Sequence, residues 1–240
     1  MTPRELASLI DHTLLRADAT PRDVSALCAE AVIHSFRTVC VNSSMVAHAS
    51  SELSGTAVGV CSVAGFPLGA TTAKAFEAGR AVFDGASEID MVIDVGLLKS
   101  GMHRAVLGDI EGVVAAAGGR TVKVILETCL LTDDEKLTAC RLAEEAGASY
   151  VKTSTGFGRA GASPADVALM ARAVGERLGV KASGGIADLD EALVMLSSGA
   201  TRLGLSRSVR IIAEMEKRAA GGVDQPPAEP PVSMPPSNRS

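Results

Sequence analysis

Two lysines stand where they could form a covalent bond with a carbonyl compound. Lys152 follows Tyr150-Val151 and Lys181 follows Val180, and small, hydroxylated or glycine residues come directly after each. Each lysine therefore closes a short apolar run that is typical of a buried strand. Barrel enzymes place their chemistry at the carboxyl ends of such strands. A deprotonated lysine amine in that position can attack a carbonyl carbon and form a Schiff base.

The attacking amine must first lose its proton, although a lysine pKa ordinarily lies near about 10.4. We expect the strands of Lys152 and Lys181 to be neighbours. At a separation of roughly 5 to 6 Å and an effective dielectric of about 20, their repulsion is about 3 kcal/mol, or roughly two pKa units. Burial in an apolar barrel mouth lowers the pKa further. The residues alone leave open a second role, in which each lysine binds phosphate or pairs with a carboxylate.

A proton shuttle is expected on another strand. Alternation along the run from Glu88 to Asp94 places Asp90, Val92 and Asp94 on one face. A carboxylate among apolar neighbours is costly unless it is paired, and the two lysines are the obvious partners. Asp90 is the better placed of the two aspartates to move protons, and a purely structural salt bridge is the alternative.

The strand before Lys152 carries two more charged side chains. Lys123 and Glu127 alternate onto one face of that strand. We expect both to brace the lysine and aspartate network from below.

Glycine-rich turns predict an anion site beside the lysines. Glycines let backbone N–H groups approach a ligand, helix N-termini favour anions, and barrels often bind phosphate after their last strands. Any one of these glycines could serve only a tight turn, but three clusters beside two lysines favour a phosphorylated ligand. The residues are Gly156, Gly184, Gly185, Gly204 and Ser206.

Short apolar runs alternate with helical patterns along the chain. Thr132 with Glu135 resembles a capping box, and Ser163 precedes a proline at a helix start. This alternation predicts an α/β fold, a (β/α)8 TIM barrel with a short N-terminal helix. An open doubly wound sheet is the alternative, although no G-x-G-x-x-G follows the first strand. The expected strands are Thr38 to Val41, Val58 to Val63, Ile89 to Ile93, Val122 to Leu126, Tyr150 to Thr153, Val180 to Ala182, Arg202 to Leu205 and, more weakly, Ile10 to Leu14.

Composition indicates one barrel domain, residues 1–218, followed by a proline-rich tail, residues 219–240, that we expect to be disordered. The net charge of −5 argues against a nucleic-acid partner, and the chain has no apolar run long enough for a membrane span. The N-terminus lacks the features of a secretory signal, and the five cysteines have no disulfide or zinc-site spacing. We therefore expect a cytoplasmic protein with reduced cysteines.

Together these motifs resemble the deoxyribose-phosphate aldolase family of class I aldolases. The resemblance covers nearly the whole predicted barrel and includes long ordered motifs, among them Asp11-His12-Thr13-Leu14-Leu15, Ala64-Gly65-Phe66-Pro67-Leu68-Gly69, Lys123-Val124-Ile125-Leu126-Glu127-Thr128, the run Val151 to Gly158 and the run Lys181 to Ile186.

The resemblance implies a homo-oligomeric enzyme, a dimer or tetramer, that uses no cofactor or metal and reversibly cleaves 2-deoxy-D-ribose 5-phosphate to D-glyceraldehyde 3-phosphate and acetaldehyde. It implies that Lys152 is the Schiff-base lysine, that Lys181 lowers its pKa, and that Asp90 transfers protons. By position in the motifs, the residues that contact the substrate are Asp11, Cys40, Lys123, Thr155, Gly156, Gly184, Gly185, Gly204 and Ser206.

The chain departs from the family pattern in places, and other functions stay open. Some members carry a C-terminal tyrosine that assists proton transfer, whereas Tyr150 is the single tyrosine here. Arg207 stands where some members have a small hydroxyl residue, and we expect it to strengthen phosphate binding, with a solvent-facing side chain as the alternative. A metal-dependent aldolase would need clustered ligands, and the four histidines are scattered. Another phosphosugar lyase or isomerase, or a phosphosugar-binding module, would use the same barrel.

Overall fold

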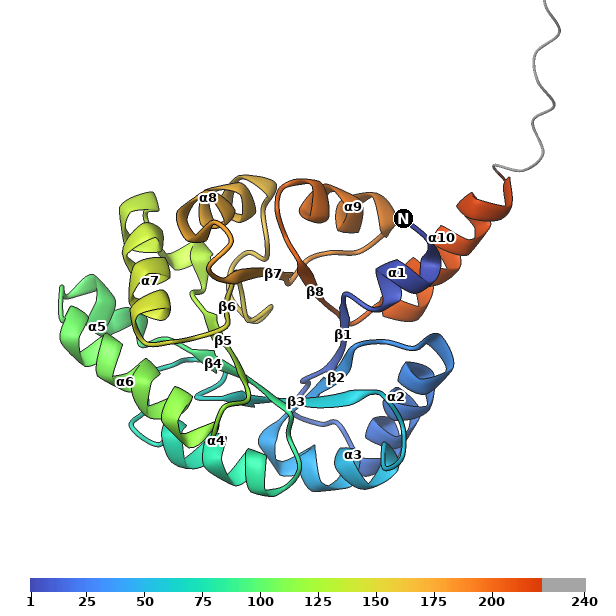
Figure 1. Ribbon diagram of the computed structural model, residues 1–240, viewed down its shortest axis with the longest axis horizontal. Coiled ribbons are helices and arrows are strands. Elements are labelled where there is room, and N and C mark those ends of the chain that lie inside the picture. The colour runs from blue at the N-terminus through green and yellow to red at the C-terminus, as the bar shows by residue number, and fades with distance from the viewer. Residues whose placement is uncertain (222–240) are drawn as a thin grey trace, which may run out of the picture.

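The chain folds into a closed barrel of eight parallel strands. A computed structural model describes residues 1–221, and Figure 1 shows the strands at the centre with helices around them. Each strand pairs with the next in sequence, and β1 pairs with β8 to close the ring. The predicted (β/α)8 TIM barrel is confirmed.

The elements alternate as the apolar pattern predicts. The strands are β1 (Ile10–Leu14), β2 (Thr38–Val41), β3 (Gly59–Ala64), β4 (Glu88–Val92), β5 (Thr121–Ile125), β6 (Tyr150–Lys152), β7 (Gly179–Ser183) and β8 (Arg202–Leu205). The α-helices are α1 (Pro3–Ala7), α2 (Pro21–His34), α3 (Val46–Glu52), α4 (Lys74–Phe83), α5 (Val95–Lys99), α6 (His103–Ala116), α7 (Asp133–Glu145), α8 (Pro164–Val174), α9 (Leu189–Ser197) and α10 (Ser208–Gly221). Two short 3-10 helices are η1 (Ser43–Met45) and η2 (Thr128–Leu130).

The helix boundaries follow local capping chemistry. Thr132 accepts a hydrogen bond from the backbone N–H of Glu135 and completes a capping box at α7. Ser163 accepts from the N–H of Asp166 at the start of α8. Both predicted caps are confirmed. No helix in residues 1–221 has both the length and the apolar character that crossing a membrane requires.

The last helix extends past the predicted domain boundary at residue 218. Helix α10 runs through Gly221, because the helical pattern continues into Ala219 and Ala220 before the glycines. The rest of the predicted tail lies outside the described residues.

The two faces of the barrel strands bury different chemistry. Outward-facing residues such as Val39, Ile89 and Val151 belong to the main hydrophobic core, which fills the layer between strands and helices. The barrel interior instead contains buried charged side chains, including Asp11, Asp90 and Lys181. Because strand side chains alternate, this interior charge comes from every second residue of neighbouring strands. The strand pattern therefore places charged groups inside a closed, water-poor barrel.

The loop between β3 and α4 generates a stability prediction. Gly69 has a φ of 73°, and a Cβ built there would lie 1.9 Å from the carbonyl oxygen of Ile93. Gly55 has a similar φ of 77° with nothing within 4 Å. We expect Gly55→Ala to lower the unfolding free energy by about 1 kcal/mol and Gly69→Ala by about 3 kcal/mol or more, because only the second adds a backbone clash. Urea denaturation of both variants checks this, and equal losses would contradict it.

Candidate active site

A network of seven charged side chains fills the lower part of the barrel interior. Its members are joined by ion pairs of 3.7 Å or less and come from six of the eight strands. They are the carboxylates Asp11, Glu88 and Asp90 and the bases Lys123, Lys152, Lys181 and Arg202. We call this set the interior network.

Asp90 is the centre of the interior network. Its Oδ1 lies 2.8 Å from Lys123 Nζ, and its Oδ2 lies 2.8 Å from Lys152 Nζ and 2.6 Å from Lys181 Nζ. Burial alone would raise the pKa of Asp90, but the charges of these three lysines hold that pKa well below its usual range. The carboxylate therefore stays ionised and accepts hydrogen bonds from all three lysine nitrogens. The predicted pairing of Asp90 with the lysines is present.

Lys181 is fixed between two carboxylates. Its Nζ lies 2.5 Å from Asp11 and 2.6 Å from Asp90. Burial would lower the pKa of Lys181, but the charges of Asp11 and Asp90 outweigh it and raise that pKa above its usual value. Strand β6 pairs with β7 so that Lys152 and Lys181 are direct partners, as expected. The expected repulsion between Lys152 and Lys181 does not include the charges of Asp11 and Asp90. Its effect on the pKa of Lys152 therefore stays a prediction.

The floor of the interior network is closed by Arg202. Its guanidinium lies 2.7 Å from Asp11 and 2.8 Å from Glu88, and Lys123 lies 2.5 Å from the same Glu88. These contacts join β8 to β1 and β4 across the barrel. Burial lowers the pKa of Lys123, but the surrounding carboxylates raise it well above its usual value. The floor is therefore a set of buried charged pairs, and neither Arg202 nor Lys123 lines the pocket among the described residues.

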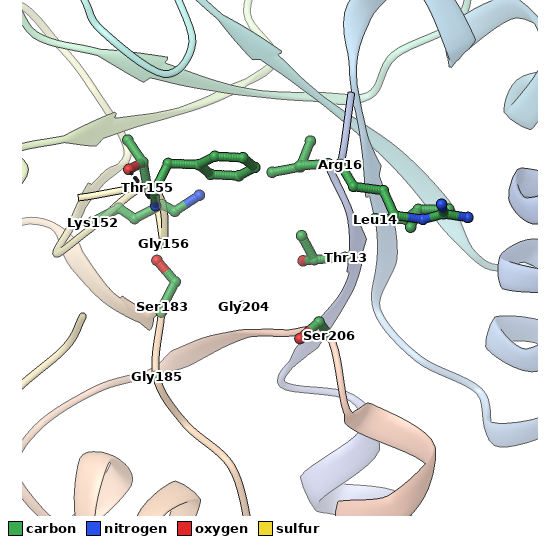
Figure 2. Close-up of a pocket in the computed structure, with 13 residues that line it drawn as sticks. Thr13, Leu14, Arg16, Lys152, Thr155, Gly156, Ser183, Gly185, Gly204 and Ser206 are labelled. Atoms are coloured by element: carbon green, nitrogen blue, oxygen red, sulfur yellow. Dashed lines mark hydrogen bonds between the residues drawn. The ribbon is translucent and has the colours of Figure 1, made fainter. Parts of the chain in front are cut away.

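Lys152 differs from the other three bases in its exposure to a ligand. Within residues 1–221, it is the member of the interior network that lines a pocket of about 290 Å³ at the carboxyl ends of the strands. Figure 2 shows its amine pointing into that pocket, with Thr13 and Ser206 on the far side. Lys152 has one carboxylate partner, Asp90, whereas the other three bases each have two or more.

The pocket wall that follows β7 and β8 is built for close approach by an anion. Gly184 and Gly185 have φ values of 83° and 80°, in the left-handed region that glycine tolerates. A Cβ at Gly204 would lie 2.9 Å from Ser183 Cβ and 3.0 Å from Lys181 Cε. Ser206 completes this wall before α10 begins. Bare backbone, a hydroxyl and a nearby helix N-terminus are the groups that phosphate sites use.

The structure brings most of the predicted site residues to this pocket. Those that line it are Lys152, Thr155, Gly156, Gly184, Gly185, Gly204 and Ser206. Lys181 and Asp90 lie directly beneath Lys152. Asp11, Cys40 and Lys123 are fully buried and do not line the pocket, because they point into the closed lower layer.

Three expectations about single side chains are corrected by the structure. Asp94 does not share a strand face with Asp90, because β4 ends at Val92 and Asp94 caps α5 by accepting from Leu97 N–H. Glu127 does not brace the network from below, because the chain turns at Glu127 (φ 54°) and its carboxylate accepts from Thr155 at the pocket edge.

Arg207 is the third. It is exposed and does not line the pocket, because Ser206 takes the pocket-facing position in that turn.

Several lining residues were not foreseen from the sequence. Thr13, Leu14, Leu15 and Arg16 come from the end of β1 and the loop after it, and Phe157 and Ser183 come from the turns after β6 and β7. The position of Thr13 to Arg16 at the carboxyl end of an expected strand is the sequence feature that could have indicated them as pocket residues.

One cluster has the composition of a metal site but is already filled by an ammonium group. Ligand atoms of Cys40, Cys61 and Asp90 lie within 4.8 Å of one another. Lys123 Nζ lies 3.4 Å from Cys61 Sγ and 2.8 Å from Asp90. A cation at this point is therefore supplied by lysine.

Comparison with known proteins identifies the family. The model of the DeoC/LacD family aldolases matches residues 6–210. The chain belongs to the DeoC/LacD family of aldolases. It is 51% identical to a deoxyribose-phosphate aldolase of Actinobacillus succinogenes, over 92% of this chain and 100% of that one. It is 55% identical to a deoxyribose-phosphate aldolase of a Geobacillus species, over 86% of this chain and 94% of the relative.

A solved structure shows the same architecture. The tetrameric deoxyribose phosphate aldolase of Aeropyrum pernix matches with a TM-score of 0.85 and 35% identity, over 90% of this chain and 93% of that one. As a member of the DeoC/LacD aldolases with such relatives, this chain is an enzyme, a carbon–carbon lyase.

The interior network predicts how stability depends on pH. The folded-state pKa values of Asp11 and Asp90 are depressed, so these groups bind fewer protons in the folded state than in the unfolded state. Their contribution to the unfolding free energy is therefore complete above about pH 4 and is lost as pH falls below about 4. The folded-state pKa values of Lys123 and Lys181 are raised, so the contribution of these two lysines to the unfolding free energy is lost only as pH rises above about 10.

Urea denaturation between pH 2.5 and 6 tests the acid side. We expect Asp11→Asn to remove about one proton from the slope of unfolding free energy against pH. The control Asp133→Asn changes a carboxylate that is 76% exposed, and we expect the wild-type slope. Equal slopes for wild type and Asp11→Asn would contradict the predicted role of Asp11.

Proposed function

We propose that this aldolase forms a Schiff base through Lys152 and reversibly cleaves 2-deoxy-D-ribose 5-phosphate to D-glyceraldehyde 3-phosphate and acetaldehyde. The observation that carries the proposal is that Lys152 is the network base that lines the pocket, while the other three bases are held by carboxylates beneath it. The names of the relatives support the substrate.

The charge balance of the interior network supports Lys152 as the nucleophile. Four bases face three carboxylates, so the network carries one excess positive charge when every base is protonated. An uncompensated charge in a buried site is costly. Loss of one proton from Lys152 balances the network, and it leaves every other base with its carboxylate partners. The resulting neutral amine faces the pocket, where a substrate carbonyl can reach it.

Asp90 is placed to transfer protons at the reacting nitrogen. Its Oδ2 lies 2.8 Å from Lys152 Nζ, within the range required of a general acid or base. The same oxygen accepts a hydrogen bond from Lys181 at 2.6 Å, so the position of the carboxylate is fixed. Asp90 and Lys181 are buried, and Lys152 is 3% exposed. Proton transfer here is therefore shielded from bulk water.

The pocket wall that follows β7 and β8 supports a phosphorylated substrate. Backbone at Gly184, Gly185 and Gly204, together with the Ser206 hydroxyl, would hold the phosphate. Fixing the phosphate at this wall sets the position of the sugar aldehyde at the other end of the molecule. Holding both ends in one geometry converts the attack into an effectively intramolecular step.

The reaction then follows from these positions. The amine of Lys152 adds to the C1 aldehyde, and water leaves to give an iminium. The C3 hydroxyl loses its proton, the bond between C2 and C3 breaks, and its electron pair moves into the iminium to give an enamine. Protonation of the enamine carbon gives the acetaldehyde imine, which water hydrolyses. In the described residues Tyr150 starts β6 and is not part of the pocket lining, so we expect the assistance that a C-terminal tyrosine gives in some family members to be absent here or supplied by water.

We further propose that the enzyme is a homo-oligomer, a dimer or tetramer, that works in the cytoplasm in deoxyribose phosphate catabolism. The Aeropyrum pernix relative is tetrameric. Phe76 and Phe83 on α4 are 79% and 81% exposed, which is typical of a surface that contacts another subunit. The five cysteines are free thiols, the state that a reducing compartment maintains.

Product analysis with a pair of lysine variants tests the proposed function. The wild-type enzyme should release acetaldehyde and glyceraldehyde 3-phosphate in equal amounts from 2-deoxyribose 5-phosphate, measured by two coupled dehydrogenase assays. Lys152→Met should lower kcat by about a thousandfold or more, because among the described residues no other lysine lines the pocket.

The matched control is Lys136→Met. Lys136 is a largely buried lysine on α7 that pairs with Asp133 and Asp166 away from the pocket, and its loss should leave kcat within about twofold. Conversion of the sugar phosphate without acetaldehyde would favour an isomerase instead. Retained cleavage by folded Lys152→Met would reject Lys152 as the nucleophile.

A further inference from the structure

His12 lies next to Asp11 in sequence but on the opposite face of β1. It is 3% exposed and bridges two helices. Its Nδ1 lies 3.0 Å from Ser208 Oγ at the start of α10, and its Nε2 lies 2.8 Å from Glu30 Oε2 on α2. We call His12, Glu30 and Ser208 the His12 cluster. It sits outside the interior network, and none of the steps above uses it.

The His12 cluster holds the turn that forms the phosphate-facing wall. Ser208 comes two residues after Ser206, which lines the pocket. The Ser208 hydroxyl lies 3.1 Å from the carbonyl oxygen of Leu205, and Leu205 is the direct strand partner of His12. His12 therefore links both ends of the turn from residue 205 to residue 208 to β1. Strand pairing holds Leu205, and the imidazole ring holds Ser208.

The chemistry of the ring decides which group donates. Burial lowers the pKa of His12, although the nearby Glu30 carboxylate acts in the opposite direction, so the neutral imidazole is favoured near neutral pH. A neutral ring has a single N–H proton. With that proton on Nε2, it is donated to the Glu30 carboxylate, and the one proton of the Ser208 hydroxyl is shared between Nδ1 and the carbonyl oxygen of Leu205. The outer carboxylate thus selects the tautomer that holds Ser208.

The connectivity of serine, histidine and glutamate resembles a hydrolase triad, but the burial of the serine excludes that role. Ser208 is 0% exposed, so no substrate can reach its oxygen. A nucleophile must be accessible to the atom that it attacks. The cluster therefore positions the backbone and does not itself react.

We propose that His12, Glu30 and Ser208 are positioning residues for substrate phosphate, which fix the turn from 205 to 208 so that Gly204 and Ser206 meet the anion. This inference rests on the proposed function and deepens it. The His12 cluster does not line the pocket, but it is bonded to the turn that carries Ser206 and has no contact with Lys152. It therefore determines the preference for a phosphorylated sugar over the same sugar without phosphate, and it contributes little to the chemical step at Lys152.

The test is the ratio of kcat/KM for 2-deoxyribose 5-phosphate to kcat/KM for 2-deoxyribose. Ser208→Ala removes one hydroxyl and its hydrogen bonds, and it should lower this ratio about fivefold or more, mainly through a higher KM for the phosphorylated sugar. The competitive inhibition constant of inorganic phosphate should rise by a similar factor. A general loss of stability would lower activity on both sugars equally and would leave the ratio unchanged.

The chain offers a matched control in a second serine–histidine pair. Ser25 Oγ lies 2.9 Å from His48 Nε2 between α2 and α3, away from the pocket. Ser25→Ala removes a hydrogen bond of the same kind, so the ratio and the phosphate inhibition constant should both keep their wild-type values.

Two substitutions of His12 separate its two hydrogen bonds. The amide of His12→Asn reaches the position of Nδ1 and retains a partner for Ser208, whereas that of His12→Gln reaches the position of Nε2 and retains a partner for Glu30. We expect His12→Asn to keep the ratio closer to wild type than His12→Gln does. The reverse order would overturn the assignment of Nδ1 as the positioning atom.

The outcomes separate this inference from the proposed function. Wild-type protein that does not release acetaldehyde from the phosphorylated sugar would reject the proposed function. Active wild type together with an unchanged ratio and an unchanged phosphate inhibition constant in Ser208→Ala would overturn only the positioning role of the His12 cluster.

Discussion

A single buried carboxylate, Asp90, constrains the rest of the site. It accepts hydrogen bonds from Lys123, Lys152 and Lys181 within 2.8 Å, in a barrel interior where an unpaired charge would be very costly. Each lysine must therefore point to the same position, although the three come from different strands. Four bases face three carboxylates, so one positive charge is not balanced, and in the proposed function that charge is lost from Lys152. The proposed reactivity of Lys152 and the stability of the barrel interior thus depend on the same ion pairs.

The floor of the barrel, the pocket above it and the surrounding helices have different roles. The floor, where Arg202 joins Asp11 to Glu88, is a set of buried charged pairs. Above it, Lys152 faces a pocket with a wall of glycine backbone and Ser206 after β7 and β8. Outside the barrel, the His12 cluster ties the turn after β8 to β1 and α2. The amine and the phosphate-facing wall are therefore held by separate sets of interactions, so they can be disturbed separately by substitution.

Much of this arrangement could be predicted from strand periodicity. Alternation and the residues after each strand indicated Lys152, Lys181 and Asp90, because these properties are local. Contacts across the barrel, such as Arg202 with Glu88, depend on the register of distant strands, which a single sequence does not encode locally. Asp94 was misplaced because the strand ends at Val92 and a helix begins, and the cap was not recognised. His12 carried no motif of its own, and its role depends on where α2 and α10 pack.

The account depends most on the claim that Lys152 alone among the buried bases reacts with substrate. Incubation with 2-deoxyribose 5-phosphate and sodium borohydride, followed by mass spectrometry of peptides, tests it most directly, because reduction converts an imine into a stable adduct. The account predicts one reduced adduct per chain, on the peptide that contains Lys152. An adduct on Lys181 or Lys123, or no adduct in folded and active enzyme, would contradict it.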